Sequence, residues 1–168
     1  MTMNAMHWRA MTTLDLPAVE AIAAAVHPAF PEDVAVFAER LRLYPDGTLL
    51  FELDGTPAGY VLSHPWRYKS LPALNSLLGA IPGDADTYYL HDLALLPSAR
   101  GTGAAAMIVG NILRHARAAG FPTASLVAVN GSLPFWYKHG FREVAAPELA
   151  EKLESYEQAA RLMARRLV

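Results

Sequence analysis

The spacing of hydrophobic residues changes several times in the first third of the chain, and each change marks a new element. Proline and glycine separate these patterns: His27-Pro28 ends one helical pattern, and Pro45-Asp46-Gly47 ends the next. The pattern predicts, in order, a strand over 7–11, a helix with the apolar face Val19, Ile22, Ala23 and Val26, a helix with the apolar face Val34, Phe37, Ala38 and Leu41, and a hairpin of strands 48–53 and 58–62.

Residues 65–86 interrupt this regular pattern. The segment contains three prolines and two glycines together with bulky side chains such as Trp66, Leu71 and Leu74. Long loops in a compact domain are commonly functional. We therefore expect a semi-ordered flap that covers another part of the molecule.

The second half of the chain is more regular. A nearly continuous apolar run over 87–96, stopped by Pro97, is typical of a central strand that is buried on both faces. The tail is ambiguous, because Leu149, Leu153 and Tyr156 keep helical spacing, whereas the positions from Ala160 onward alternate as in a strand. Between these segments the pattern predicts a helix over 101–119, a strand over 125–129, a short helix over 133–139 and a strand over 141–144. Alternating strands and helices in a chain of this length predict one α/β domain over residues 1–168.

Composition narrows the classes of function. The 168 residues carry 14 Lys and Arg against 16 Asp and Glu, and this balance of −2 gives no electrostatic reason to expect nucleic acid or an anionic membrane as partner. Cysteine is absent, which excludes disulfides, thiolate metal sites and cysteine nucleophiles. Residues 1–11 contain no apolar core of a signal peptide, and no stretch reaches the ~18 apolar residues that span a bilayer. We expect a cytoplasmic protein without a metal.

Candidate chemistry lies where the strand over 87–96 meets the following helix. Gly101 and Gly103 let a ligand approach the backbone, and a helix N-terminus adds unpaired N–H groups and a positive dipole end, which favours phosphate. The alternative is that the glycines only connect a loop to the start of a helix and bind no ligand. A dinucleotide site is disfavoured because no Asp or Glu occurs in 121–128, and a triphosphate loop is excluded because no Gly-Lys-Ser/Thr follows. Coenzyme A, which also carries a diphosphate, is the other ligand for such a turn.

Neighbouring motifs also point to coenzyme A. Arg100-x-x-Gly103-x-Ala105 is similar to a pyrophosphate-binding motif, Gln/Arg-x-x-Gly-x-Gly/Ala, and it follows a Leu-Ala-Leu-x-Pro strand. A second strand ends at Asn130, and the run 135–141 with Tyr137 and a closing Gly-Phe comes after it. In this order, the motifs over 87–144 resemble the GNAT superfamily of acyl-CoA N-acyltransferases, and 8–62 is consistent with it. The resemblance implies an α/β (α+β) fold with a mixed sheet of about seven strands, about four helices, and a tail that forms a helix and then a strand.

The resemblance implies a role for each matching residue. Leu93, Ala94 and Leu95 would lie on the strand whose main chain pairs with the pantetheine arm, and the Leu95 N–H would hold the thioester oxygen. Asn130 would bond to the pantetheine, and Tyr137 would stand near the sulfur as the acid for the leaving thiolate. The diphosphate would be enclosed by Arg100, Gly101, Thr102, Gly103, Ala104 and Ala105.

The base that takes the amine proton is argued from the residues themselves. Strand alternation puts His91 on the same face as Leu93 and Leu95, and an imidazole titrates near neutral pH. A histidine held in the core by hydrogen bonds is the alternative for His91. Asp92 faces the other way unless a bulge re-aims it, so it is the second choice. Contacts to the acceptor are expected from Phe30, Glu32, Tyr44, His64, Trp66 and Tyr68.

These features predict an N-acetyltransferase that moves the acetyl group of its cosubstrate acetyl-CoA to a primary amine of a small molecule, by direct attack in a ternary complex. The expected partner is that amine, without nucleic acid or membrane, and a homodimer is left open. Two alternatives also stay open. One is a non-catalytic CoA-binding GNAT-like module, and the other is a nucleotide-dependent oxidoreductase that uses the Gly101–Gly103 turn.

Overall fold

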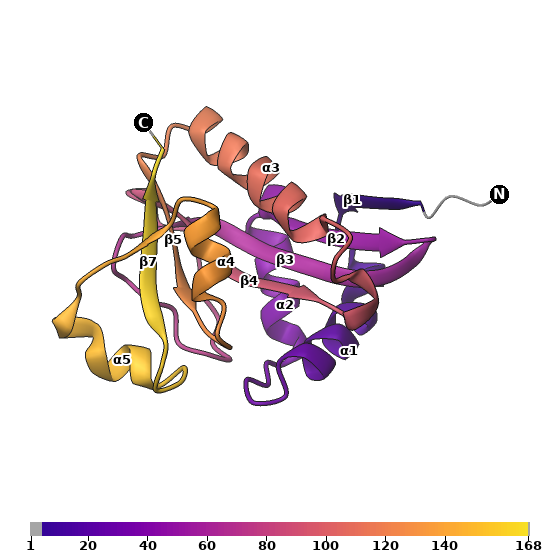
Figure 1. Ribbon diagram of the computed structural model, residues 1–168, viewed down its shortest axis with the longest axis horizontal. Helices are drawn as coiled ribbons and strands as arrows, with labels where there is room; N and C mark the ends of the chain where they lie inside the picture. The colour runs from indigo at the N-terminus through magenta and orange to yellow at the C-terminus, as the bar shows by residue number, and fades with distance from the viewer. Residues whose placement is uncertain (1–4, 168) are drawn as a thin grey trace.

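A seven-stranded mixed sheet forms the middle layer of the computed structural model, which describes residues 5–167 (Figure 1). Residues 1–4 lie outside the described part, and they include the start of segment 1–11, in which the sequence predicts no signal peptide. The strand order is β1-β2-β3-β4-β5-β7-β6, and only the β4–β5 pair is parallel among the strand pairs of residues 5–167. The strands are β1 Met6–Ala10, β2 Thr48–Leu53, β3 Thr56–Trp66, β4 Thr87–Leu95, β5 Thr123–Ala128, β6 Arg142–Glu143 and β7 Arg161–Arg166. The predicted mixed sheet is confirmed.

Helices cover both faces of the sheet. On one face, α1 Leu16–Val26 and α2 Val34–Leu43 bury a core with Phe37, Leu50 and Tyr60. On the other face, α3 Ala104–Ala118 and α4 Leu133–Lys138 bury Ile108, Leu126 and Trp136 among others. A fifth short helix, α5 Ala150–Glu154, precedes β7, so the tail forms a helix and then a strand as expected.

Strand β3 continues past its predicted end. It includes Pro65 and Trp66, although the sequence pattern placed both in the flap. Strand β2 pairs with β3 only as far as Leu62, so Pro65 occupies a part of β3 that has a partner on one side alone. A proline is tolerated at such an edge because no ladder hydrogen bond is needed there. Beyond Trp66, the flap contains no helix or strand over residues 67–86.

Strands β4 and β5 separate halfway along their length. They pair through Tyr88, Tyr89 and Leu90 of β4, and beyond Leu90 the remaining residues of β4 pair with β3 alone. The N–H of Leu96 bonds to Ala58 O of β3 at 2.8 Å. Because N–H groups alternate in direction along a strand, those of Leu93 and Leu95 point away from β3. They face the gap between the separating strands.

A bulge at His91 changes the direction of the side chains that follow it. Leu62 pairs with Asp92 and Ser63 pairs with Leu90, so His91 has no opposite residue on β3. A bulge of this kind interrupts strict alternation. Consequently, His91 and Asp92 both turn toward the side of α1 and α2, where His91 meets Glu32 and Asp92 meets Tyr60. Asp92 keeps its expected orientation away from Leu93 and Leu95, whereas the expectation that His91 shares their face is wrong.

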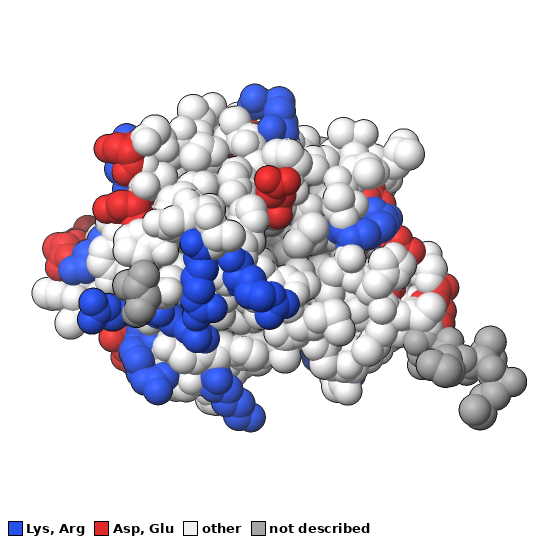
Figure 2. Space-filling model, turned by 90° about the horizontal axis from the view of Figure 1, so that it is seen from above, with Lys and Arg blue, Asp and Glu red and all other residues white. Residues whose placement is uncertain are grey.

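Charge is distributed unevenly over the surface. Figure 2 shows Lys and Arg side chains gathered on one part of the face seen there, with Asp and Glu mostly elsewhere. Lys138, Arg142, Arg165 and Arg166 surround a shallow hollow formed by α4, β6 and β7. The small net charge therefore conceals a local positive surface. Within residues 5–167, none of the helices is long and apolar enough to cross a membrane.

Candidate active site

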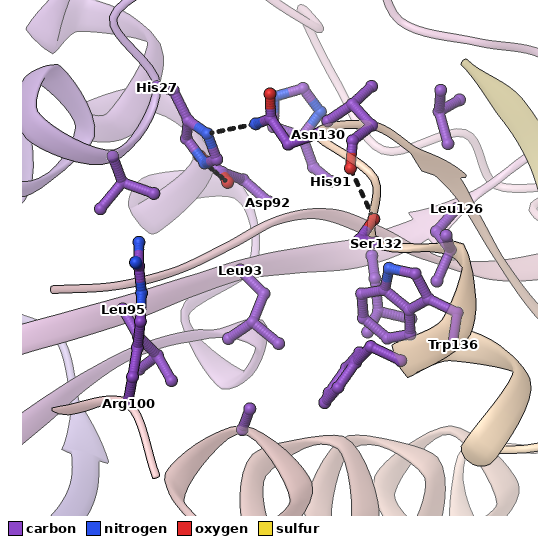
Figure 3. Close-up of a pocket in the computed structure, with 16 residues that line it drawn as sticks. His27, His91, Asp92, Leu93, Leu95, Arg100, Leu126, Asn130, Ser132 and Trp136 are labelled. Atoms are coloured by element: carbon purple, nitrogen blue, oxygen red, sulfur yellow. Dashed lines mark hydrogen bonds and ion pairs between the residues drawn. The ribbon is translucent and has the colours of Figure 1, made fainter. Parts of the chain in front are cut away.

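The gap between β4 and β5 holds a cavity of about 310 Å³, here called the gap pocket (Figure 3). Its walls come from the end of α1, from β4, from the glycine turn before α3, from β5 and from α4. Half of the predicted site residues line it. These are His91, Leu93, Leu95, Arg100, Ala105 and Asn130.

The glycine turn at one end of the gap pocket presents free backbone. Gly101 and Gly103 have φ of 78° and 87°, a region that side chains disfavour, and a Cβ on either would meet no atom within 4 Å. Thr102 Oγ1 donates to Ala99 O at 2.6 Å, which fixes the turn. The helix N-terminus that follows suits a diphosphate in this open space, so the turn fits the group that the sequence predicts for it.

Two of the predicted residues, Ala94 and Ala104, do not line the gap pocket. Ala94 is 1% exposed and packs into the core under α1 and α2. Ala104 is also buried, and its carbonyl accepts a hydrogen bond from Trp8 Nε1 at 2.9 Å. Both alanines are small, which lets the strand and the first turn of α3 pack closely.

Trp136, and not Tyr137, faces the gap pocket. Trp136 is 7% exposed and lines the cavity, whereas Tyr137 is 40% exposed and its hydroxyl donates to Glu143 on the outer surface at 2.8 Å. The end of α4 explains the difference: the N–H of Gly140 bonds to Tyr137 O and that of Phe141 to Trp136 O. This pair of hydrogen bonds at the end of a helix brings the residue after the glycine against the residue five positions earlier. The rings of Phe141 and Trp136 indeed lie 5.4 Å apart.

A second cavity of about 50 Å³, here called the inner pocket, adjoins the gap pocket. The two share a wall that includes His27, His91 and Asp92. The inner pocket lies under the flap and adds Glu32 and the apolar side chains of Phe30, Phe37 and Leu74. Titratable groups thus stand where the two cavities meet.

His91 is paired with Glu32 at this wall. His91 Nε2 lies 3.2 Å from Glu32 Oε1, and both side chains are almost fully buried. Burial would raise the pKa of Glu32, but the hydrogen bond and charge of His91 outweigh it, so the pKa of Glu32 is lowered. A carboxylate that accepts the Nε2 proton leaves Nδ1 with a free lone pair. Among residues 5–167, His91 Nδ1 has no hydrogen-bond partner.

His27 and Asp92 form a second pair, shown in Figure 3. His27 Nε2 lies 2.7 Å from Asp92 Oδ1, and Tyr60 donates to Asp92 Oδ2. Burial would lower the pKa of His27, but Asp92 raises it above its ordinary value. Burial would raise the pKa of Asp92, but the hydrogen bond with His27 holds that pKa below its ordinary value. The two therefore favour an ion pair. On its other side, His27 Nδ1 lies 3.3 Å from Asn130 Nδ2.

The comparison with known proteins decides the family. Residues 8–141 match the model described as the Acetyltransferase (GNAT) family, which covers most of the chain. The chain belongs to the GNAT acetyltransferase family. No curated protein matches the sequence.

Solved structures share this GNAT fold at low sequence identity. The GphF GNAT-like decarboxylase in complex with isobutyryl-CoA has a TM-score of 0.78 and 19% identity, with 96% of this chain and 100% of that chain covered. Ard1 from Thermoplasma volcanium has a TM-score of 0.73 and 17% identity, with 98% and 99% covered. Arabidopsis thaliana Naa50 in complex with the bisubstrate analogue CoA-Ac-MVNAL has a TM-score of 0.71 and 13% identity, with 95% and 97% covered. These similarities establish the fold.

Only two of the six residues expected to contact the acceptor line one of the two pockets. Phe30 and Glu32 line the inner pocket. His64 is buried and Trp66 partly buried on the adjoining part of β3, with ring centroids 5.3 Å apart. Tyr44 lies away from both pockets, because its hydroxyl bonds to His115 Nε2 on α3 at 2.7 Å. Tyr68 is a flap residue that lines neither pocket and is held by its N–H to Asp86 Oδ1.

Sequence reasoning missed His27 and Trp136. His27 was assigned only as the end of a helix, and its partners Asp92 and Asn130 are 65 and 103 residues away in the chain. No local pattern reports such contacts. Trp136 had a usable signal in the Gly140-Phe141 pair, since a helix-ending glycine followed by an apolar residue predicts which side chain packs inward. Within residues 5–167, no group of three His, Cys, Asp or Glu could hold a metal ion.

Proposed function

We propose that this GNAT protein transfers an acetyl group from acetyl-CoA to a primary amine of a small molecule, by direct attack of the amine in a ternary complex. One observation carries the proposal: the gap pocket runs from the glycine turn to His91 and Asp92, where it shares a wall with the inner pocket. A donor and an acceptor could occupy adjoining cavities, with titratable side chains between them.

The chain offers binding groups along the gap pocket for acetyl-CoA, which supplies the activated acetyl group. The open turn at Gly101 and Gly103 and the start of α3 suit the diphosphate. The N–H groups of Leu93 and Leu95 are free to hydrogen-bond to the pantetheine arm and to the thioester oxygen, as an added strand would. Trp136 and Leu126 supply apolar walls that exclude water.

His91 is the proposed base. Its Nδ1 lone pair is free because Glu32 accepts the Nε2 proton, and Glu32 thereby positions the ring. His27 suits this task less well, because the ion pair with Asp92 favours its protonated form. Asp92 is also a weaker base, since its pKa is lowered. Tyr137 is not assigned the role of acid, since its hydroxyl lies outside the pocket; a thiol with a pKa of about 8.5 can leave as thiolate near neutral pH.

The proposal is tested with acetyl-CoA, a panel of primary amines and a reagent that detects free thiol. We expect thiol release that depends on the amine, and the Gly103→Glu variant should lose it at acetyl-CoA concentrations that saturate the native protein. Binding is measured in parallel by calorimetry. Tight acetyl-CoA binding without amine-dependent thiol release would establish a non-catalytic module instead. Binding of NADH or NADPH with equal affinity would favour the oxidoreductase alternative.

A further inference from the structure

The inner pocket lies against the flap, which contributes Leu74 to its wall. Apolar side chains from α1, α2, the flap and β5 form most of its wall, and His27, Glu32, His91 and Asp92 form the rest. Resting on the proposed function, we propose that the acceptor is a small primary amine with a compact apolar body and no carboxylate, and that the flap excludes peptide N-termini.

Hydrogen bonds fasten the flap on two sides. Glu39 of α2 accepts from the N–H groups of Leu78 at 2.6 Å and Gly79 at 3.0 Å. On the other side, the Tyr156 hydroxyl donates to Pro72 O. Tyr156 and Leu74 both line the inner pocket, so the fastened segment is its roof. An extended peptide that entered amine-first would have to displace this roof.

Glu32 joins the roof to the reacting end of the pocket. Its Oε2 accepts from the N–H of Asn75 in the flap at 3.1 Å, while its Oε1 lies 3.2 Å from His91 Nε2. The flap residue next to Leu74 is thereby held to the side chain that positions the proposed base. Leu74 and His91 line the same inner pocket, so an amine bound under Leu74 would share that cavity with His91.

Charge at the polar end favours an ammonium and opposes a carboxylate. Glu32 and Asp92 both have lowered pKa values and carry negative charge at neutral pH. The buried guanidinium of Arg40 on α2 does not line the pocket, and its Nη2 donates to Ser76 O at 3.3 Å. A carboxylate on the acceptor would meet like charge with no lining cation apart from the two histidines.

The volume limits the apolar body. A cavity holds one water-sized group per roughly 10–15 Å³ of this measure, so about 50 Å³ accommodates about three to five non-hydrogen atoms. Isobutylamine fits this description. Valine is the same molecule with a carboxylate added, and valinamide replaces that carboxylate by a neutral amide.

The first test compares these three amines and the dipeptide Val-Ala in the thiol-release assay with acetyl-CoA. We expect kcat/KM for isobutylamine to exceed that for valine and for the dipeptide by about 100-fold, with valinamide between them. Equal or higher values for the dipeptide would overturn the inference while leaving the proposed function intact. If none of these four amines releases thiol although another primary amine of the panel does, the inference fails and the proposed function stands. If no amine of the panel releases thiol although acetyl-CoA binds, the proposed function fails as well.

The second test changes the roof. Leu74→Ala enlarges the inner pocket, so kcat/KM for 3-methylbutylamine relative to isobutylamine should rise about tenfold, the value of one methylene in an apolar pocket. Leu77→Ala in the same flap is the matched control, because Leu77 is 61% exposed and lines neither pocket. Unchanged amine preference in Leu74→Ala, or a shift in preference from acetyl-CoA to isobutyryl-CoA instead, would show that the inner pocket does not receive the amine.

Discussion

Trp136 and Tyr137 are neighbours in the chain but face opposite ways because of how α4 ends. The two hydrogen bonds at Gly140 and Phe141 set the last turn so that Trp136 packs against Phe141 and toward the gap pocket. The Tyr137 hydroxyl instead donates a hydrogen bond to Glu143 on the outer surface. At the scale of single residues, the end of α4 therefore decides which of the two neighbouring aromatic side chains lines the gap pocket.

This orientation gives opposite expectations for the two aromatic residues. Tyr137→Phe should change kcat by less than about twofold, because the lost hydrogen bond is an exposed one. Trp136→Leu should raise KM for acetyl-CoA about tenfold by removing part of the pocket wall. Steady-state kinetics on both variants check this. A large fall in kcat for Tyr137→Phe with unchanged KM would restore its role as the acid.

His91→Gln tests the proposed base. Glutamine keeps a similar volume and hydrogen bonding but cannot take up the amine proton, so kcat should fall about 10²-fold or more while KM for acetyl-CoA stays within about twofold. Activity of the native protein should decline toward acidic pH, because an imidazolium cannot accept a proton, and this dependence should flatten in the variant. His139→Gln is the control, since His139 lines neither pocket. A variant that keeps full activity and the acidic decline would shift the assignment to Asp92 or to water.

At the scale of elements, regular packing is what the sequence predicts well. The run 87–96 became β4 Thr87–Leu95 and the run 101–119 became α3 Ala104–Ala118, because burial repeats with the period of the element. The bulge at His91 leaves no such trace, because it depends on how β3 and β4 align across the sheet. The pairs His27–Asp92 and His91–Glu32 were also unpredictable, since each joins segments far apart in the chain.

The two ends of α3 provide a matched test of the diphosphate site. Gly103 precedes the helix and Gly120 follows it, with φ of 87° and 88°, and a Cβ on either would meet no atom within 4 Å. Glutamate at either position therefore adds the same strain and charge. Gly103→Glu should weaken acetyl-CoA binding at least tenfold by calorimetry, and Gly120→Glu should not. Equal weakening, or none in either folded variant, would mean that the diphosphate binds elsewhere.

At the scale of the whole molecule, buried histidine sets how stability depends on pH. His64 is 1% exposed, and burial lowers its pKa to about 3. An unfolded chain binds a proton at this residue below about pH 6.5, whereas the folded protein does not, so folding stability falls by up to about 1.4 kcal/mol per pH unit as pH decreases. Hydrogen bonding with Arg9 lowers the pKa of Asp15 to about 2, and the stability that this carboxylate provides is lost only below about pH 4.

Urea denaturation at pH 6.0 and 5.0 separates these contributions. Asp15 stays ionised throughout this pH range, so it does not contribute to the change in stability. The raised pKa of His27 changes the stability in the opposite direction, but it does so equally in the native protein and in the His64→Gln variant. Native protein should lose about 1.2 kcal/mol more than His64→Gln between the two pH values. Parallel losses would show that His64 is protonated in the folded state.

The most direct test of the proposed transfer is a two-substrate kinetic experiment in which N-acetylisobutylamine and free coenzyme A are both quantified. With acetyl-CoA and isobutylamine varied together, direct attack in a ternary complex predicts intersecting double-reciprocal lines and one acetylamine for each coenzyme A released. Parallel lines would indicate an acetylated enzyme. Release of coenzyme A without acetylamine would contradict transfer to the amine.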